Sequence, residues 1–201
     1  VDRPVATPGT RAPDAVLRFH LHPEVEARLD TGGAKLVLAS GELWLFRFDG
    51  PKLFVAGNHE LWTHGPDSYA LLRDALPRRV QAMGWHWLED QPFTLGNFAI
   101  VGSIGWYDYS YAHAELGIPL RFYEHKVSPG AAARLGQYAG LLSPGDDIAP
   151  AAIEICSRWN DGRFVKLGRS DPAFLDELLQ CLAMQLHDTR SARHVIAAVH
   201  H

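Results

Sequence analysis

The sequence predicts an α/β fold, because short apolar runs typical of buried strands occur between segments with helical periodicity. Residues 35–39 read KLVLA and residues 52–56 read KLFVA, and runs of this kind suit strands that are covered on both faces. A third run, HVIAAV at residues 194–199, follows a long amphipathic segment. The first two runs favour a sheet with parallel strands.

Length and composition favour a single domain. The chain has 201 residues, of which 47% are apolar and 21% charged, enough to bury one sizeable core. We predict one domain over residues 1–201, with a flexible lead-in rich in Pro and Gly at residues 1–14. Residues 112–169 break any regular period and are predicted to form a cap or insert.

The charge balance gives no indication of a nucleic-acid partner. The formal net charge is -4 and the pI is near 6.3, whereas nucleic-acid-binding domains usually carry a basic stripe or a high pI. A local basic patch on an acidic protein stays open. Cys156 and Cys181 lack metal-type spacing, and no apolar run is long enough to span a bilayer. These features predict no membrane contact and a cytoplasmic location, and no pattern indicates the oligomeric state.

The first elements are expected in the order strand, helix, strand. Residues 15–19 suit a short strand, residues 23–29 are rich in Glu and Ala and suit a helix, and residues 35–39 form the first buried run. Only residues 43–51 lie between that run and the next strand, although a parallel crossover generally needs a dozen or more residues. Either the two strands are not parallel neighbours, or a segment is missing between them.

A helix is predicted to follow the second apolar run. Asp67 or Ser68 can cap its N-terminus, and Pro77 is expected to close it. Its apolar positions share one face and are Leu71, Leu72, Ala75 and Leu76.

The middle of the chain is predicted to be mixed or antiparallel. Strands are expected at residues 85–88 and 98–102, and the Gly96-Asn97 pair before the second is a tight-turn signal. Beyond these strands, only residues 131–142 and 150–159 have a helical pattern.

The strongest helix signal lies near the C-terminus. Ser170 or Asp171 can serve as N-cap, and Pro172 suits the first helical position. The apolar stripe of this helix is Phe174, Leu175, Leu178, Leu179, Leu182 and Leu186. Residues 194–199 then form a predicted buried strand.

Residues 57–60 read GNHE directly after an apolar run and form the candidate site. The glycine permits a sharp turn, the carbonyl oxygen of Asn58 is a hard donor for a divalent metal, and His59 can contact a phosphate or donate a proton. His200 and His201 follow the last strand and offer imidazole ligands at the same sheet edge. The alternative is an ordinary strand-to-loop turn with a left-handed Asn58 and His59 on the surface.

GNHE, and VHH at residues 199–201, resemble the third and fourth sequence blocks of calcineurin-like metallophosphoesterases. GWYDYS at residues 105–110 is similar to a segment of a bacterial branch of that family. The resemblance implies a four-layer α/β/β/α sandwich that is incomplete at the C-terminus, because the final Gly-His-x-His block of the family does not occur here. The chain begins without Met and ends at His201, which we interpret as a fragment or an incomplete record.

The first two blocks of that family are matched with departures. His20-Leu21-His22 stands where the family has Asp-x-His, so His22 matches and His20 replaces the aspartate. Gly41-Glu42 stands where the family has Gly-Asp. The side chain of Glu42 is one methylene longer than that of aspartate, which would displace a carboxylate that bridges two metals.

The resemblance implies a metal-dependent phosphoric ester hydrolase that cleaves a phosphomonoester or phosphodiester with water activated by two divalent metal ions. Mn, Fe or Zn would suit the mixed donors, and a small phosphorylated substrate is the expected partner. His59 and His22 receive catalytic roles. The implied metal ligands are Asn58, His200, Glu42, His22, His20 and His201. Two alternatives stay open: a catalytically defective binding or scaffold module of this family, and an incomplete record of an active enzyme.

Overall fold

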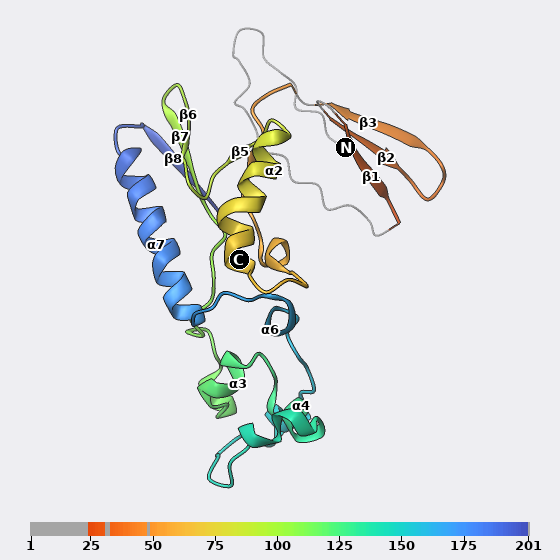
Figure 1. The fold of residues 1–201 in the computed structure, drawn as a ribbon, viewed down its shortest axis with the longest axis vertical. Helices are drawn as coiled ribbons and strands as arrows, with labels where there is room; N and C mark the ends of the chain where they lie inside the picture. The colour runs from red at the N-terminus through yellow and green to blue at the C-terminus, as the bar shows by residue number, and fades with distance from the viewer. Residues whose placement is uncertain (1–23, 31–32, 48, 201) are drawn as a thin grey trace. The chain divides into compact units, whose positions relative to one another are not determined.

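A computed structural model describes residues 24–30, 33–47 and 49–200 (Figure 1). Its contacts divide the chain into two compact units, Val1–Gly50 and Pro51–His201, and each has sheets of its own. The single domain and the cap predicted from the sequence stay predictions. Within the described part of the chain, no helix combines the length and apolar character needed to cross a bilayer.

The predicted α/β class is confirmed in a mixed form. The described residues form three sheets, of three, two and three strands, together with helices in the second unit. Both parallel and antiparallel pairs occur among these strands. The four-layer α/β/β/α sandwich of metallophosphoesterase type is not established by this arrangement.

The first unit contains an antiparallel meander of three strands. They are β1 (Glu26–Asp30), β2 (Gly33–Val37) and β3 (Leu43–Arg47), with β2 in the centre. Gly41 adopts a positive φ of 81° in the hairpin between β2 and β3, and the Leu38 N–H donates to the Glu42 carbonyl at 2.9 Å. A positive φ is available to glycine without steric cost, so this residue suits the turn.

Two predictions for this unit are wrong. The predicted helix at 23–29 contains β1, because the alternation of Val25, Ala27 and Leu29 has the period of a strand and outweighs the helix propensity of Glu and Ala. The run at 35–39 is not a parallel strand buried on both faces, since β2 pairs antiparallel with β1 and β3 and its side chains are half-buried or exposed. The predictions for residues 1–14 and 15–19 fall outside the described residues.

The strand pairing explains why only residues 43–51 separate the apolar run at 35–39 from the one at 52–56. Residues 43–47 themselves form β3, and the strand at 52–56 pairs elsewhere. The two apolar runs are therefore not parallel neighbours, which is the first of the two interpretations given by the sequence.

The second unit begins with a parallel pair. β4 (Leu53–Phe54) pairs in parallel with β5 (His86–Trp87), which confirms both predicted strands. The connection holds a continuous helical segment made of α1 (Ser68–Ala70), η2 (Leu71–Ala75) and α2 (Leu76–Ala82). The Asp67 side chain accepts from the Ala70 N–H at 2.8 Å, so the predicted N-cap is confirmed.

Pro77 does not close this helix, contrary to the prediction. The η2 segment is a π-helical turn in which the Leu76 N–H donates to the Leu71 carbonyl. The wider turn changes the hydrogen-bond register, so that Pro77 lies in the first turn of α2, where its missing N–H is tolerated. The helix then continues to Ala82.

The third sheet has the strand order β6-β7-β8. β6 (Phe93–Leu95) and β7 (Phe98–Ser103) form a hairpin, with Gly96 at a φ of 56°, which confirms the predicted strand at 98–102 and the predicted turn before it. β8 (His194–Val199) runs parallel to β7 as an edge strand. The prediction that this last strand is buried is wrong, because most of its side chains, including Ile196 at 49% exposure, lie open to solvent among the described residues.

The predicted C-terminal helix is α7 (Asp171–Asp188), and it packs along β7 (Figure 1). Ser170 caps it and Pro172 occupies the first turn, as predicted. Phe174 and Leu178 enter the core of the unit, whereas Leu179 and Leu186 are exposed, so the predicted stripe is only partly buried. The main core consists of Ala56, Leu61, Leu72, Val80, Trp87, Ile104, Leu167, Phe174 and Leu178.

A second apolar cluster lies within residues 114–164. Its buried members are Phe122, Val127, Ala131 and Ala132. The helices of this segment are η3 (Ala114–Leu116), α3 (Leu120–Glu124), α4 (Pro129–Arg134), η4 (Gly136–Leu141), α5 (Pro150–Glu154) and α6 (Asp161–Phe164). The helix predicted at 131–142 is split at Leu135, whose backbone is extended, and the one predicted at 150–159 ends at Glu154.

Candidate functional site

The GNHE turn forms a short 3-10 helix, η1 (Asn58–Leu61), a few residues after β4. The Gly57 N–H donates to Oε2 of Glu60 at 2.7 Å, which tightens the turn. Leu61 is fully buried and anchors it, while His59 is exposed. Asn58 is not among the described non-glycine residues with positive φ, so the left-handed conformation expected in the alternative is wrong, whereas His59 on the surface fits it.

The imidazole of His200 lies against Gly57. A Cβ atom built on Gly57 would stand 2.8 Å from Cδ2 and 2.9 Å from Nε2 of His200, and 3.1 Å from Oε2 of Glu60. The His200 N–H donates to the Ser103 carbonyl at 3.2 Å, which extends the pairing of β8 with β7. The structure therefore brings the GNHE turn and His200 together, and Gly57 is the residue that leaves room for the ring.

Substitution of Gly57 by alanine is expected to lower the free energy of unfolding by no more than about 1 kcal/mol, because the added methyl meets the outer end of the exposed His200 ring, which can shift. The backbone of Gly57, with φ -111° and ψ 177°, is open to any residue, so the cost comes from space alone. Urea unfolding measures the difference. Gly140→Ala is the control, because no heavy atom lies within 4 Å of the Cβ it would add. Equal stabilities for the two variants would show that the ring is not held against Gly57.

One of the remaining predicted ligands lies among the described residues. Glu42 lies exposed in the β2–β3 hairpin of the first unit. His20, His22 and His201 fall outside the described residues. Across residues 24–30, 33–47 and 49–200, no three His, Cys, Asp or Glu side chains gather in a way that could hold a metal ion. The two divalent ions stay a prediction.

Asn58 is held by a buried carboxylate that the sequence did not reveal. Its Nδ2 donates to both carboxylate oxygens of Asp161, at 3.0 and 2.9 Å. Nε1 of Trp62 donates to the same carboxylate at 2.5 Å, and the Tyr107 hydroxyl lies 3.5 Å from it. Asp161 is 7% exposed, so these donors compensate the cost of burying its charge. It lies 103 residues from Asn58, beyond any local sequence pattern.

A second buried carboxylate, Asp171, begins α7. Nζ of Lys126 lies 2.5 Å from it, and Nε1 of Trp106 donates at 2.6 Å. The Tyr109 hydroxyl donates to it as well. Tyr109 and Lys126 are the two described non-glycine residues with positive φ, 69° and 54°. Such conformations cost free energy and persist where the surroundings hold them, so Asp171 fixes both strained residues.

The two phenols beside these carboxylates are held in the protonated form. Burial raises the pKa of Tyr107 well above its usual value, and the nearby charges of Asp171 and Asp161 raise it further. The pKa of Tyr109 is raised for the same reason, with the hydrogen bond to Asp171 as the next contribution. Both hydroxyls are therefore donors at neutral pH, which suits a fixed scaffold around Asn58 and Lys126.

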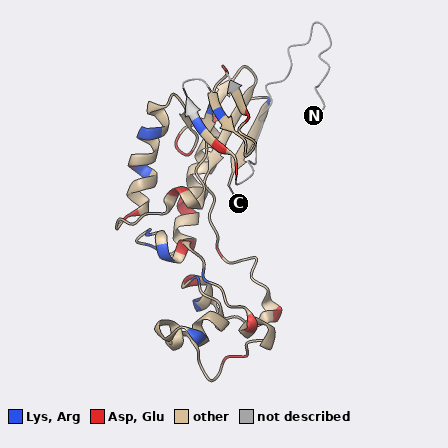
Figure 2. Ribbon diagram, turned by 90° about the vertical axis from the view of Figure 1, so that its right-hand side faces the viewer, with Lys and Arg blue, Asp and Glu red and all other residues tan. Residues whose placement is uncertain are grey.

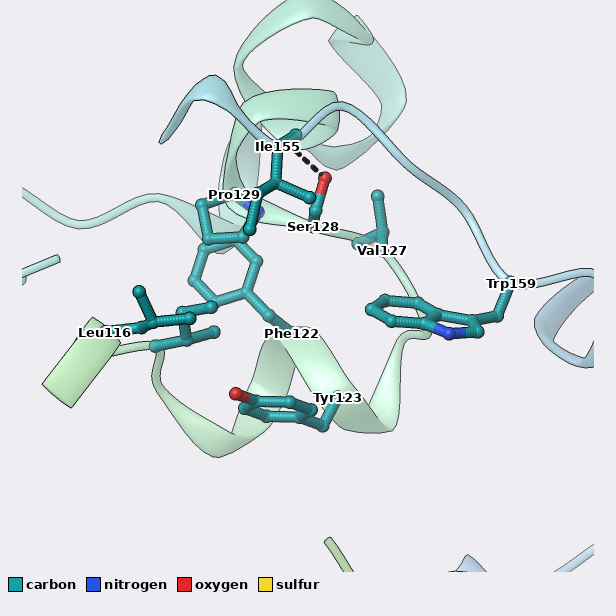
Figure 3. A pocket seen from close by; sticks show the side chains of 9 residues that line it. Leu116, Phe122, Tyr123, Val127, Ser128, Pro129, Ile155 and Trp159 are labelled. Carbon is teal, nitrogen blue, oxygen red and sulfur yellow. Dashed lines mark hydrogen bonds between the residues drawn. The ribbon is translucent and has the colours of Figure 1, made fainter. Parts of the chain in front are cut away.

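An apolar pocket of about 180 Å³ lies in the segment between η3 and α6 (Figure 3). The Ser128 hydroxyl, one of its polar groups, donates to the Ile155 carbonyl at 2.6 Å and accepts from the Ser157 N–H at 2.9 Å. The hydrogen-bond donor of this hydroxyl is therefore already used within the protein. The pocket is lined by Leu116, Ile118, Phe122, Tyr123, Val127, Ser128, Pro129, Ile155 and Trp159.

One family model matches the chain, and it describes a Heparinase II/III-like, C-terminal domain. The match covers residues 3–65, less than half of the chain, and includes the β1–β3 meander and the GNHE turn. No curated protein and no solved structure matches the chain. Over the matched segment, the chain is therefore similar to a domain of an enzyme-related family.

This match corrects the family and the function drawn from the resemblance. GNHE lies inside a segment that matches a different family, so the assignment to calcineurin-like metallophosphoesterases is wrong. The function inferred from that assignment, a phosphoric ester hydrolase, is therefore wrong as well. A tetrapeptide carries little family information, because a strand followed by Gly, Asn, His and Glu also makes an ordinary capped turn. The structure shows such a turn, with Glu60 bonded back to Gly57.

Proposed function

We propose that this chain is a polysaccharide-binding part of a protein related to polysaccharide lyases. The observation that carries the proposal is the match of residues 3–65 to a heparinase-like domain. The antiparallel meander β1–β3 lies within the matched residues, and the match continues into η1 of the second unit.

The second unit contains cationic residues that could contact an anionic polymer. In Figure 2, positions of Lys and Arg occur along this unit among those of Asp and Glu. A polymer offers many equivalent groups, so modest local sites can give useful retention through avidity. A contribution from local cations is expected to weaken as salt is added.

Affinity electrophoresis of the 201-residue chain tests the proposal. The chain is run through gels containing heparin, alginate or dextran, the last being a neutral polymer. Retardation by heparin or alginate, relieved by salt and not seen with dextran, is the expected result. Unchanged mobility in all three gels would contradict the proposed function.

A further inference from the structure

Four aromatic rings form a continuous row where η1 meets α6. The centroids of His59 and Trp62 are 3.8 Å apart, and that of Phe164 follows 5.6 Å from Trp62. His64 stands edge-on to Phe164 at 5.6 Å. The two histidines are exposed, and the other two rings are half-buried. We call His59, Trp62, His64 and Phe164 the aromatic ledge.

The ledge is held in place before any ligand arrives. Nε1 of Trp62 donates to Asp161 at 2.5 Å, and the same carboxylate holds Asn58. The Thr63 N–H donates to the Phe164 carbonyl at 2.9 Å and joins the two segments that carry the rings. A preordered surface loses little conformational entropy when it binds.

Two exposed cationic side chains belong to the segment that carries Phe164. The guanidinium of Arg163 lies 5.3 Å from the centroid of the Phe164 ring, and Lys166 follows in the same segment. Both side chains are exposed, and neither has an ion pair among the described residues. The acidic residues of the two stretches 59–64 and 161–166 are Glu60, which accepts a hydrogen bond from the Gly57 N–H, and buried Asp161, which accepts from Asn58 and Trp62.

We propose that the aromatic ledge binds one anionic sugar ring, its C–H face on the aromatic surface and its carboxylate or sulfate beside Arg163 and Lys166. Aromatic faces carry negative charge density and attract polarised C–H groups, and cations beside them select an anion. The inference rests on the proposed function, because it locates the site for the polysaccharide. A nucleic-acid base could also stack here, but the similarity of residues 3–65 to a heparinase-like domain favours the sugar.

The test is calorimetric titration of the 201-residue chain with a heparin tetrasaccharide at low salt. Trp62→Ala is expected to weaken binding about tenfold by removing the central ring. Arg163→Gln removes an exposed charge without touching the scaffold and is expected to weaken binding about threefold. The matched controls are Trp159→Ala, a half-exposed tryptophan of the separate apolar pocket, and Arg193→Gln, another exposed arginine. Both controls are expected to bind as the unchanged chain does.

The outcomes separate the two proposals. No binding by the unchanged chain would contradict the proposed function itself. Binding that survives both Trp62→Ala and Arg163→Gln would leave the proposed function intact and overturn the ledge as its site. Tighter binding of a short single-stranded oligonucleotide than of the tetrasaccharide would overturn the sugar as the ligand. Should Trp62→Ala unfold, Arg163→Gln and Trp62→Phe, which keeps a ring, decide the question.

Discussion

Replacement of Asp171 by alanine is expected to lower the free energy of unfolding by about 3–5 kcal/mol, because it leaves the ammonium of Lys126 buried without its partner. The side chains of Lys126 and Asp171 are 13% and 8% exposed, so water cannot replace the lost contact. The change also removes the acceptor of Trp106 and Tyr109, and Tyr109 and Lys126 lose the contact that holds their positive φ angles. Urea unfolding followed by circular dichroism measures the loss.

Asp176→Ala is the matched control, since Asp176 lies in the same helix and is exposed. It is expected to change the free energy of unfolding by less than about 0.5 kcal/mol. The double variant Asp171→Leu with Lys126→Met removes both charges and should recover part of the stability. If Asp171→Ala were as stable as Asp176→Ala, the buried ion pair would not be what holds this region together.

The free energy of unfolding is also expected to fall as the pH rises from about 4.5 to 7, because the buried carboxyl of Glu89 has a raised pKa. Burial raises the pKa of this carboxyl from 4.5 to about 7. The charge of Arg73 and the backbone hydrogen bond at Ile104 lower this pKa, and the charge of Asp90 raises it. Glu89 is 3% exposed, and its Oε1 has no hydrogen-bond partner in the described structure. In this pH range the folded chain keeps a proton that the unfolded chain has released, so folding becomes less favourable by up to about 3 kcal/mol.

Glu89→Gln isolates this contribution, because glutamine has the same shape and does not titrate. Free energies of unfolding are measured at pH 4.5, 6 and 7.5 for the unchanged chain, for this variant and for Glu154→Gln, whose side chain is exposed. The advantage of Glu89→Gln over the unchanged chain should grow with pH, and Glu154→Gln should show no such trend. Parallel pH profiles for all three proteins would mean that Glu89 does not hold a proton in the folded state.

The elements that the sequence predicted correctly are those with short-range signals. The cap at Asp67, the Ser170-Asp171-Pro172 start of α7 and the Gly96-Asn97 turn each depend on neighbouring residues alone. The failures depend on pairing and environment. Residues 26–30 became a strand because β2 lies beside them, and β8 is exposed because it is an edge strand of the described sheet.

The candidate site was predictable only in part. A histidine after the last strand and a turn after β4 were expected to meet, and the structure places the His200 ring against Gly57. Asp161 and Lys126 gave no signal, because their partners Asn58 and Asp171 lie 103 and 45 residues away in the chain. The row of rings in the aromatic ledge likewise depends on contacts between η1 and α6 that no sequence period encodes.

Hydrogen–deuterium exchange of the 201-residue chain, with and without a heparin tetrasaccharide, tests most directly whether the chain binds an acidic polysaccharide. The account predicts slower exchange in peptides that cover residues 58–65 and 161–166, and unchanged exchange in the exposed edge strand β8. Identical exchange with and without the sugar, at concentrations where a bound fraction would be large, would contradict it.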